Sequence, residues 1–201
     1  MFTGIVTDIG EVVDFQPRAG ELFRFSIACT YDRATIAIGA SIACAGVCLT
    51  VVETGDTSGR TWFAVDAAAE TLDLTTAGEW REGRKLNLER SLKIGDELGG
   101  HLVSGHADGI AEVIGREDMT GQARFRLRAP SSLSRFIAKK GSVALDGVSL
   151  TVNEVEGDEF SVLVIPHTLE VTTVGDWQPG STVNLEIDVM ARYAARLMEA
   201  R

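Results

Sequence analysis

The chain has 201 residues, of which 45% are hydrophobic and 24% charged, and its formal net charge is −10 at pH 7. The length allows one or two globular domains, and the acidic balance without any run of Lys and Arg argues against a nucleic-acid surface, which needs a basic footprint. The N-terminus lacks a basic, apolar leader and no stretch approaches the roughly 18 apolar residues of a membrane span, so we expect a soluble, cytoplasmic protein.

From the N-terminus onward, short β-rich runs separated by Gly, Asp and Pro dominate the sequence. They are residues 23–27, 47–52, 62–65 and 85–89, with counterparts in the second half at 124–127, 160–164 and 182–186. This near-regular spacing is typical of an all-β protein. We predict two tandem six-stranded Greek-key β-barrels, because closure removes the exposed edges of short strands.

Two interruptions of this pattern predict one short helix in each half. They cover residues 31–38 and 131–140. Ser131 or Ser132 is the expected N-cap of the second helix, because a serine hydroxyl can accept a hydrogen bond from a backbone N–H of the first turn.

The C-terminal residues 189–201 are rich in Ala, Arg, Met and Leu. Val189, Tyr193 and Leu197 recur at intervals of four, beside Met190, Ala194 and Met198. This spacing predicts an α-helix of about three turns with one apolar stripe. The stripe packs either on the chain's own barrel or against another subunit, and we expect an oligomerisation helix.

The two halves repeat one sequence. Residues 39–53 and 140–154 are identical at 8 of 15 positions, sharing the pattern S-x-A-x-x-G-V-x-L-T-V-x-E at an offset of 101. The later pattern T-L-x-x-T-T-x-G-x-W ends at Trp80 and at Trp177, an offset of 97, so the second copy is four residues shorter, and we expect the deletion in the turn at 54–60. We therefore predict two homologous barrels, residues 1–97 and 98–188, followed by the helix at 189–201.

Residues that usually mark metal or cofactor sites are sparse. The cysteines at 29, 44 and 48 and the histidines at 101, 106 and 167 lack the spacing of zinc ligands, and three cysteines provide no disulfide framework. The sequence contains neither a P-loop nor a G-x-G-x-x-G motif. No metal and no cofactor is expected.

Several motifs in register resemble the riboflavin synthase family of tandem lumazine-binding barrels. They are the opening M-F-T-G-I-V, the paired segments G-x-C-L-T at Gly46 and G-x-S-L-T at Gly147, the stretch G-G-H-L-V-S-G-H at 99–106, and N-L-E-I-D at 184–188. The resemblance covers the chain from residue 1 to the C-terminal helix, and the coincidence of several motifs is more specific than any one of them.

The resemblance implies a transferase that acts on two identical molecules. In this family two molecules of 6,7-dimethyl-8-ribityllumazine react, a four-carbon unit passes from one to the other, and the products are riboflavin and 5-amino-6-(D-ribitylamino)uracil, the last step of riboflavin biosynthesis. Two related barrels then offer one pocket for each molecule. The resemblance also implies a homotrimer held by the tail helices, and lumazine synthase as a further partner.

The expected catalytic residues are Cys48, Ser149, His106 and Asp188. Cys48 and Ser149 occupy the same repeat position, and either can assist nucleophilic addition at C7 of a lumazine. His106 stands where the first copy has Ile5, and it is the expected proton-transfer group. Asp188 is expected to stabilise charge or to orient a hydroxyl.

Each of these residues also has a structural interpretation. Cys48 fits a small buried strand residue, His106 a loop histidine without function, and Asp188 an exposed carboxylate at a strand end. His101 is equally well explained by the turn between the two domains.

The binding segments of the family are carried over residue by residue. Gly46 and Gly147 permit close approach to the backbone. In the first barrel the expected substrate-binding residues are Gly4, Ile5, Val6, Ser41, Cys48, Leu49, Thr50, Asp66, Ala67, Ala68, Ala69, Glu70 and Thr71. In the second they are Gly105, His106, Ala107, Ser149, Leu150, Thr151, Ile165, Pro166, His167, Thr168, Leu169 and Glu170, with Lys140 reaching the pocket of a neighbouring subunit.

The threonines and His167 among these residues each have a second interpretation or depart from the family pattern. Thr71 and Thr168 are shared by both copies, and on equivalent strands they are also simple β-formers. His167 stands where many family members have glutamate, which changes a contact in the second pocket.

A second function remains open. Lumazine and blue fluorescent antenna proteins are non-catalytic relatives with the same tandem barrels, and they bind one chromophore without carbon transfer. Retention of the thiol or hydroxyl at Cys48 and Ser149, and of the threonines in both copies, favours the enzyme. A flavin-barrel oxidoreductase would need a nicotinamide-binding α/β domain, for which the chain has no room.

Overall fold

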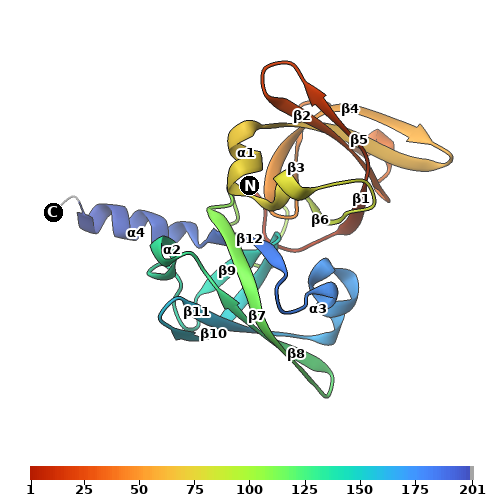
Figure 1. The fold of residues 1–201 in the computed structure, drawn as a ribbon. Helices are drawn as coiled ribbons and strands as arrows, with labels where there is room; N and C mark the ends of the chain where they lie inside the picture. The colour runs from red at the N-terminus through yellow and green to blue at the C-terminus, as the bar shows by residue number, and fades with distance from the viewer. Residues whose placement is uncertain (200–201) are drawn as a thin grey trace.

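Two closed β-barrels, one from each half of the sequence, form the body of the protein (Figure 1). The computed structural model describes residues 1–199. The first barrel consists of β1 (Asp8–Arg18), β2 (Leu22–Cys29), β3 (Ser41–Cys44), β4 (Val47–Thr57), β5 (Arg60–Ala68) and β6 (Lys85–Arg90). The second consists of β7 (Gly109–Met119), β8 (Gln122–Arg128), β9 (Ser142–Leu145), β10 (Val148–Glu156), β11 (Glu159–Val164) and β12 (Thr182–Ile187). The prediction of an all-β fold with six strands in each copy is confirmed.

The strands of each barrel are antiparallel and close in equivalent orders. The first barrel runs β1-β2-β5-β4-β3-β6 and returns to β1, and the second runs β7-β8-β11-β10-β9-β12 in the same way. The neighbours β2 and β5 are not consecutive in sequence, as a Greek-key connection requires. Closure leaves neither barrel with a free edge.

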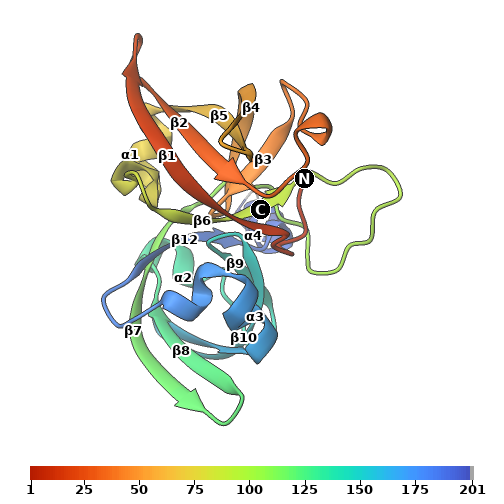
Figure 2. The same ribbon diagram turned by 90° about the vertical axis from the view of Figure 1, so that its right-hand side faces the viewer.

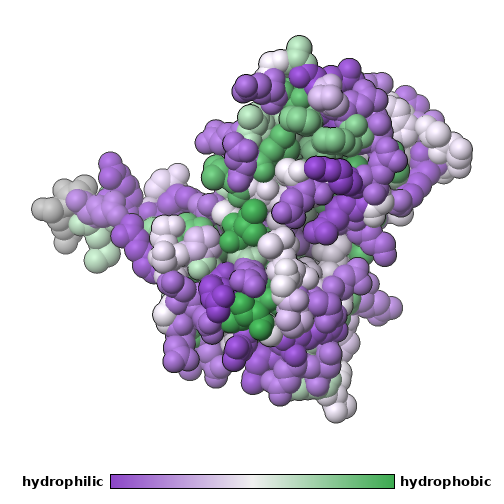
Figure 3. Space-filling model, viewed as in Figure 1, coloured by the Kyte–Doolittle hydropathy of each residue, from purple (hydrophilic) through white to green (hydrophobic). Residues whose placement is uncertain are grey.

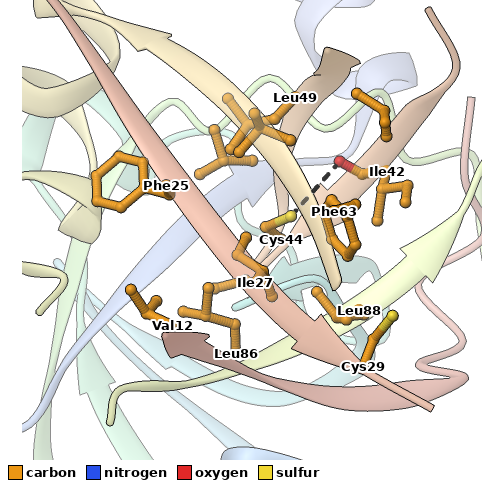
Figure 4. Packing of buried hydrophobic residues seen from close by; sticks show 14 of the residues in the cluster. Val12, Phe25, Ile27, Cys29, Ile42, Cys44, Leu49, Phe63, Leu86 and Leu88 are labelled. Carbon is orange, nitrogen blue, oxygen red and sulfur yellow. Dashed lines mark hydrogen bonds between the residues drawn. The ribbon is translucent and has the colours of Figure 1, made fainter. Parts of the chain in front are cut away.

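Side chains along each strand point alternately into the barrel interior and toward its outer surface. On β4, Val47, Leu49 and Val51 are buried, whereas Cys48 is half-buried and Thr50 is exposed on the outer face. The inward side chains of the first barrel converge on one apolar core, in which aromatic and aliphatic groups surround the buried Cys44 (Figure 4). The outer face of β4 is therefore available for other contacts.

The β4–β5 hairpin carries the length difference between the copies. Ten residues separate the paired Glu53 and Ala64, whereas six separate the equivalent pair Glu154 and Ser161. The two-residue turn is present in both copies, so the second copy lacks two residues from each arm. The deletion lies in the predicted hairpin, although it shortens the arms and not the turn.

The short helices differ from the expectation. The interval 131–140 contains α2 (Ser131–Ser134), but 31–38 contains only the 3-10 turn Arg33–Thr35. The predicted serine N-cap of α2 is wrong: Pro130 precedes the helix, and its carbonyl accepts hydrogen bonds from Leu133 N and Ser134 N at 2.8 and 3.2 Å, so no hydroxyl is used.

Two further helices lie where strands were expected. α1 (Ala69–Leu74) follows β5 and α3 (Pro166–Val171) follows β11, and the 3-10 turns Thr76–Glu79 and Thr173–Asp176 continue them. Thr71 and Thr168 therefore lie on helices, and their interpretation as β-formers on equivalent strands is wrong. Pro166 opens α3 at a position where proline is favoured, because its missing N–H has no partner in a first turn.

The two barrels meet through reciprocal side-chain contacts. Asn87 on β6 donates to the Asp146 carbonyl at 2.9 Å, and Asn184 on β12 donates to the Ala45 carbonyl at 2.8 Å. A Cβ on Gly46 would lie 2.6 Å from Gly147 N, so the two turns are in backbone contact. Apolar surface also gathers where the barrels meet (Figure 3). The duplicated halves are thus joined about a pseudo-two-fold axis.

The C-terminal helix α4 (Val189–Glu199) projects from the second barrel (Figure 1). Ion pairs of 2.7 Å join Arg192 to Asp108 and Arg135 to Glu199, so the polar side of the helix faces its own barrel. No helix among residues 1–199 is long and apolar enough to cross a membrane.

The predicted apolar stripe of α4 faces outward. Tyr193, Leu197 and Met198 are 63%, 72% and 76% exposed. The alternative in which this stripe packs on the chain's own barrel is therefore wrong, because the two ion pairs hold the other side of the helix there. Residues 200 and 201 of the predicted helix lie outside the described residues.

Candidate functional site

Two segments that precede the barrels cross between them. We call residues 1–7 the first crossing segment and residues 102–108 the second. They pair with each other through Phe2 and Val103, with N–O distances of 2.7 and 3.1 Å, and the Phe2 side chain is fully buried. The long connection from β6 to the second segment extends away from both barrels (Figure 2). The crossing segments therefore occupy the junction of the two barrels.

A buried glutamate anchors each crossing segment to its own barrel. Glu89 on β6 accepts hydrogen bonds from Thr3 N, Thr3 Oγ1 and Gly4 N at 2.7–2.9 Å. Glu186 on β12 accepts the equivalent three bonds from Ser104 and Gly105 at 2.6–2.9 Å. Burial raises the pKa of Glu89, and the three donors oppose that effect. These carboxylates fix the backbones of the two segments. The only sign of this role in the sequence is that the glutamate is repeated in both copies.

Each crossing segment then reaches the outer strand of the opposite barrel. Ser149 N on β10 donates to Gly4 O at 2.8 Å, and Cys48 N on β4 donates to Gly105 O at 2.8 Å. Both glycines have positive φ, and a Cβ on either would lie 2.5–2.6 Å from the Cβ of Ser149 or Cys48. Val6 also packs on the core of the second barrel.

The pairing of predicted segments is therefore exchanged between the copies. The sequence groups Gly4, Ile5 and Val6 with Cys48 in the first barrel, and it groups Gly105, His106 and Ala107 with Ser149 in the second. The structure instead brings Gly4 to Ser149 and Gly105 to Cys48. The original grouping is wrong because each segment is anchored on its own barrel but extends across the junction.

Polar groups gather on the outer face of each pair β3–β4 and β9–β10. Ser41 is opposite Thr50, with Cys48 two residues along the same face. In the second barrel Thr151 and Ser149 take the equivalent places. Leu49 and Leu150, also predicted to bind substrate, point inward and are buried, so only their backbones can contact a ligand.

His101 completes the group around Ser149. Its Nδ1 lies 2.7 Å from Ser149 Oγ, and its backbone N donates to Thr3 O at 3.1 Å. A Cβ on Gly100 would lie 2.1 Å from Thr3 O and 2.9 Å from Ser149 Cβ, so the chain before His101 packs directly against this site. From the sequence, His101 is equally well explained by the turn between the two domains, because nothing in the sequence shows its contact with Ser149, 48 residues away.

The remaining predicted catalytic residues are placed differently. His106 is exposed beside Gly105. Asp188 is half-buried and accepts a hydrogen bond from Met190 N at 2.9 Å, so it caps the first turn of α4. Its charge also favours the protonated form of His101. Asp188 is thus a helix cap close to the Ser149 site.

The helix-bearing segments lie at the ends of β5 and β11. Asp66 forms a bidentate ion pair with Arg24 at 2.7 and 2.9 Å, and this hydrogen bonding lowers the pKa of Asp66. Among the other predicted residues, Ala67 is buried, Ala69, Thr71, Thr168 and Leu169 are half-buried, and Ala68, Glu70, Ile165, Pro166, His167 and Glu170 are exposed. Lys140 is exposed in a left-handed conformation with φ 66°.

The cysteines differ in their surroundings. Cys29 and Cys44 are buried, and burial raises the pKa of both thiols. Cys48 is half-buried. A buried thiol with a raised pKa is a poor nucleophile, so Cys48 is the cysteine whose position suits chemistry.

These features define a duplicated barrel protein with two equivalent outer-face sites, one built around Cys48 and the other around Ser149. The sequence profile of the lumazine binding domain matches the chain twice, at residues 3–91 and 104–188. The chain therefore belongs to the lumazine-binding riboflavin synthase family.

The full-length relatives support this assignment. The chain is 59% identical to the riboflavin synthase of Brucella abortus (strain 2308) over 201 residues, which cover 99% of this chain and 98% of that one. It is 41% identical to the riboflavin synthase of Photobacterium phosphoreum, with 98% and 89% covered. The fold resembles that of LumP complexed with riboflavin, with a TM-score of 0.82 at 24% identity, covering 93% of this chain and 99% of that one.

Proposed function

We propose that this protein is a riboflavin synthase, a transferase that converts two molecules of 6,7-dimethyl-8-ribityllumazine into riboflavin and 5-amino-6-(D-ribitylamino)uracil. The observation that carries the proposal is the retention of both outer-face sites, each with a nucleophilic side chain at Cys48 or Ser149 and a threonine two residues on. A reaction between two identical molecules needs two related sites. Full-length identity of 59% to a riboflavin synthase supports the same function.

The chemistry needs two aligned heterocycles and a few polar groups. Holding two rings in reactive geometry lowers the barrier by as much as roughly 7–11 kcal/mol, because it replaces an encounter in solution. Removal of a proton from the C7 methyl group leaves a negative charge on the pteridine, which hydroxyls such as those of Thr50 and Thr151 can stabilise. Cys48 and Ser149 are placed to add to C7. The predicted binding segments on α1 and α3 remain part of this proposal.

We also propose a homotrimer held by α4. The exposed stripe at Tyr193, Leu197 and Met198 supports this, since a helix with one solvent-facing apolar stripe is stabilised by covering it. The outer-face sites lie on the barrel surface, so a neighbouring subunit can supply a second wall, including Lys140.

The test is to mix the purified protein with 6,7-dimethyl-8-ribityllumazine and to separate the products by chromatography. One riboflavin and one ribitylaminouracil for every two lumazines consumed is the expected result. Tight binding without turnover would instead assign the chain to the antenna class, and His167→Glu would be the first variant to make. Cys48→Ser and Ser149→Ala, measured separately, then report whether the two sites have different roles.

A further inference from the structure

Three arginines lie on the outer face of β8, the strand between β7 and β11. Arg124, Arg126 and Arg128 are exposed there, and the residues between them are buried in the barrel. On β7, Glu117 is paired in register with Arg124 and Glu112 with Arg128. Each of these carboxylates lies 3.5 Å from the guanidinium group that it faces. Arg126, the middle arginine, forms no ion pair among residues 1–199.

A cavity occupies the place where a carboxylate would face Arg126. The β7 residue opposite Arg126 is Gly115, and a Cβ on Gly115 would lie 3.5 Å from Arg126 Nε, so the arginine side chain passes over the glycine. The cavity measures about 420 Å³, which is within the range of small-molecule sites. Its lining residues are Gly115, Arg116, Glu117, Arg124, Arg126 and Glu154. Three guanidinium groups and two carboxylates therefore surround a space large enough for a ligand.

The first barrel differs from the second at these positions. The row of outer-face residues Gly115, Arg126 and Ser161 corresponds to Asp14, Ser26 and Ala64 in the first copy. A carboxylate in the first copy is thus replaced by a glycine, and a hydroxyl by a guanidinium group. The charge of this row changes from negative to positive, so only the second barrel presents an unpaired cation beside an open space.

A buried hydroxyl adjoins Arg126 on its other side. Ser161 on β11 is paired in register with Arg126 and is only 3% exposed. Its Oγ has no hydrogen-bond partner among residues 1–199, although buried hydroxyls in proteins are nearly always paired. Ser161 and Arg126 both line a second cavity of about 170 Å³. An unpaired guanidinium group and an unpaired hydroxyl therefore lie side by side.

We propose that this face of the second barrel binds the phosphate group of a small ligand, with Arg126 as its main partner. A guanidinium group presents its N–H donors in a fork that matches the oxygens of a phosphate. The Ser161 hydroxyl can donate a further hydrogen bond. Arg116 and Arg124 line the same cavity and add positive potential. The carboxylate of Glu154 can accept hydrogen bonds from hydroxyl groups of a phosphate ester.

This site is separate from the two outer-face sites at the barrel junction. Ser149 and Thr151 precede the bulge of β10, whereas Glu154 follows it. The hairpin of β7 and β8 points away from the first barrel (Figure 1). Neither the lumazine nor the two products of the proposed reaction carries a phosphate group. The inference therefore concerns a ligand other than the substrate.

The test is a binding titration by ³¹P NMR line width, with inorganic phosphate and with glycerol 3-phosphate, at an ionic strength kept constant with sodium chloride. The wild type should broaden both signals in a saturable way, and tighter binding of the ester would identify a phosphate ester as the ligand class, whereas equal binding would identify phosphate itself. Arg126→Ser, which installs the residue of the first copy, should lower the affinity roughly 10-fold or more. Arg128→Ser removes the same charge from a paired position and should lower it less than about threefold. No saturable broadening, or equal losses in both variants, would overturn the proposal.

A second variant tests the open space opposite Arg126. Gly115→Asp restores the carboxylate of the first copy, and it should fold, because Gly115 is outside the left-handed region and its Cβ would make only ordinary contacts of 3.5 and 3.7 Å. We expect it to weaken phosphate binding roughly 10-fold or more, since the new carboxylate would pair with Arg126 and repel the anion. The control Thr120→Asp adds the same charge to the exposed turn of the hairpin and should weaken binding less than about threefold. Equal weakening would show that only net charge matters and would refute the site. None of these measurements uses turnover, so their failure leaves the proposed function unaffected.

Discussion

The contact between the second crossing segment and β4 leads to a quantitative prediction at Gly105. Gly105 has φ +77°, and a Cβ at this position would lie 2.6 Å from Cys48 Cβ and 3.0 Å from a ring carbon of Phe2. Gly59, in the β4–β5 turn, also has φ +77°, but a Cβ there would have no atom within 4 Å. The variants Gly105→Ala and Gly59→Ala therefore share the same backbone strain and differ only in the contact.

The magnitudes follow from the two contributions. Alanine in the left-handed region costs about 1–2 kcal/mol, reduced by about 0.4–1 kcal/mol because alanine also restricts the unfolded chain, so Gly59→Ala should lower the free energy of unfolding by about 1 kcal/mol. Overpacking adds about 1–3 kcal/mol at Gly105. We therefore expect Gly105→Ala to lower the free energy of unfolding by about 2–4 kcal/mol.

Urea denaturation followed by tryptophan fluorescence, at one protein concentration for all variants, measures both values. Lumazine binding to the first-barrel site should weaken in Gly105→Ala and not in Gly59→Ala, because only Gly105 adjoins Cys48. Equal losses of stability in the two variants would refute the reasoning, since the contact would then contribute nothing.

Three further results are expected. Burial raises the pKa of Asp146 from 3.8 to about 7, so its contribution to stability is full below pH 3.8 and is lost as the pH rises to about 7. Over that range the free energy of unfolding of the wild type should fall by up to about 4 kcal/mol relative to that of Asp146→Asn, and parallel stability curves of the two proteins would contradict this. Glu186→Gln should lower the free energy of unfolding, measured by urea denaturation, by about 2–4 kcal/mol, because the new amide NH₂ would face donors of the second crossing segment. The exposed control Glu97→Gln should change it by less than about 0.5 kcal/mol, and equal effects would disprove the anchoring role. Leu197→Glu should shift the protein to smaller species in analytical ultracentrifugation, and the neighbouring control Arg196→Ser should not; an unchanged distribution in both argues against a trimer held by α4.

Much of the fold is readable from local patterns. The strand runs, the barrel count and the tail helix follow from residue alternation, from the repeat and from the spacing of Val189, Tyr193 and Leu197. The errors are also local: α1 and α3 were missed because runs such as those around Thr71 and Thr168 have no strong helical period. A single turn of helix is decided by where the chain leaves the barrel, which no short window of sequence contains.

Individual residues of the candidate site could be predicted from the sequence, but not which crossing segment lies beside which barrel. Cys48, Ser149 and Gly105 were named from the sequence, and the structure places all three at the barrel junction. The contact of His101 with Ser149 could not be predicted because the two residues are 48 positions apart. The catalytic role expected of Asp188 stays a prediction, and its hydrogen bond to Met190 N adds a capping role that a strand-end carboxylate does not reveal in sequence.

By itself the sequence determined that the protein is duplicated, that each copy is a barrel of six strands, and that the tail carries an apolar stripe, because these properties depend on periodicity along the chain. Only the tertiary structure decided which barrel each crossing segment serves. The two copies offer the same hydrogen-bond donors, so from the sequence alone the Gly4 carbonyl could accept a hydrogen bond from the backbone N of either Cys48 or Ser149. Each segment is anchored by Glu89 or Glu186 of its own barrel and is hydrogen-bonded to a strand of the other barrel. These contacts join residues far apart in the sequence, so no local pattern records which barrel receives each segment.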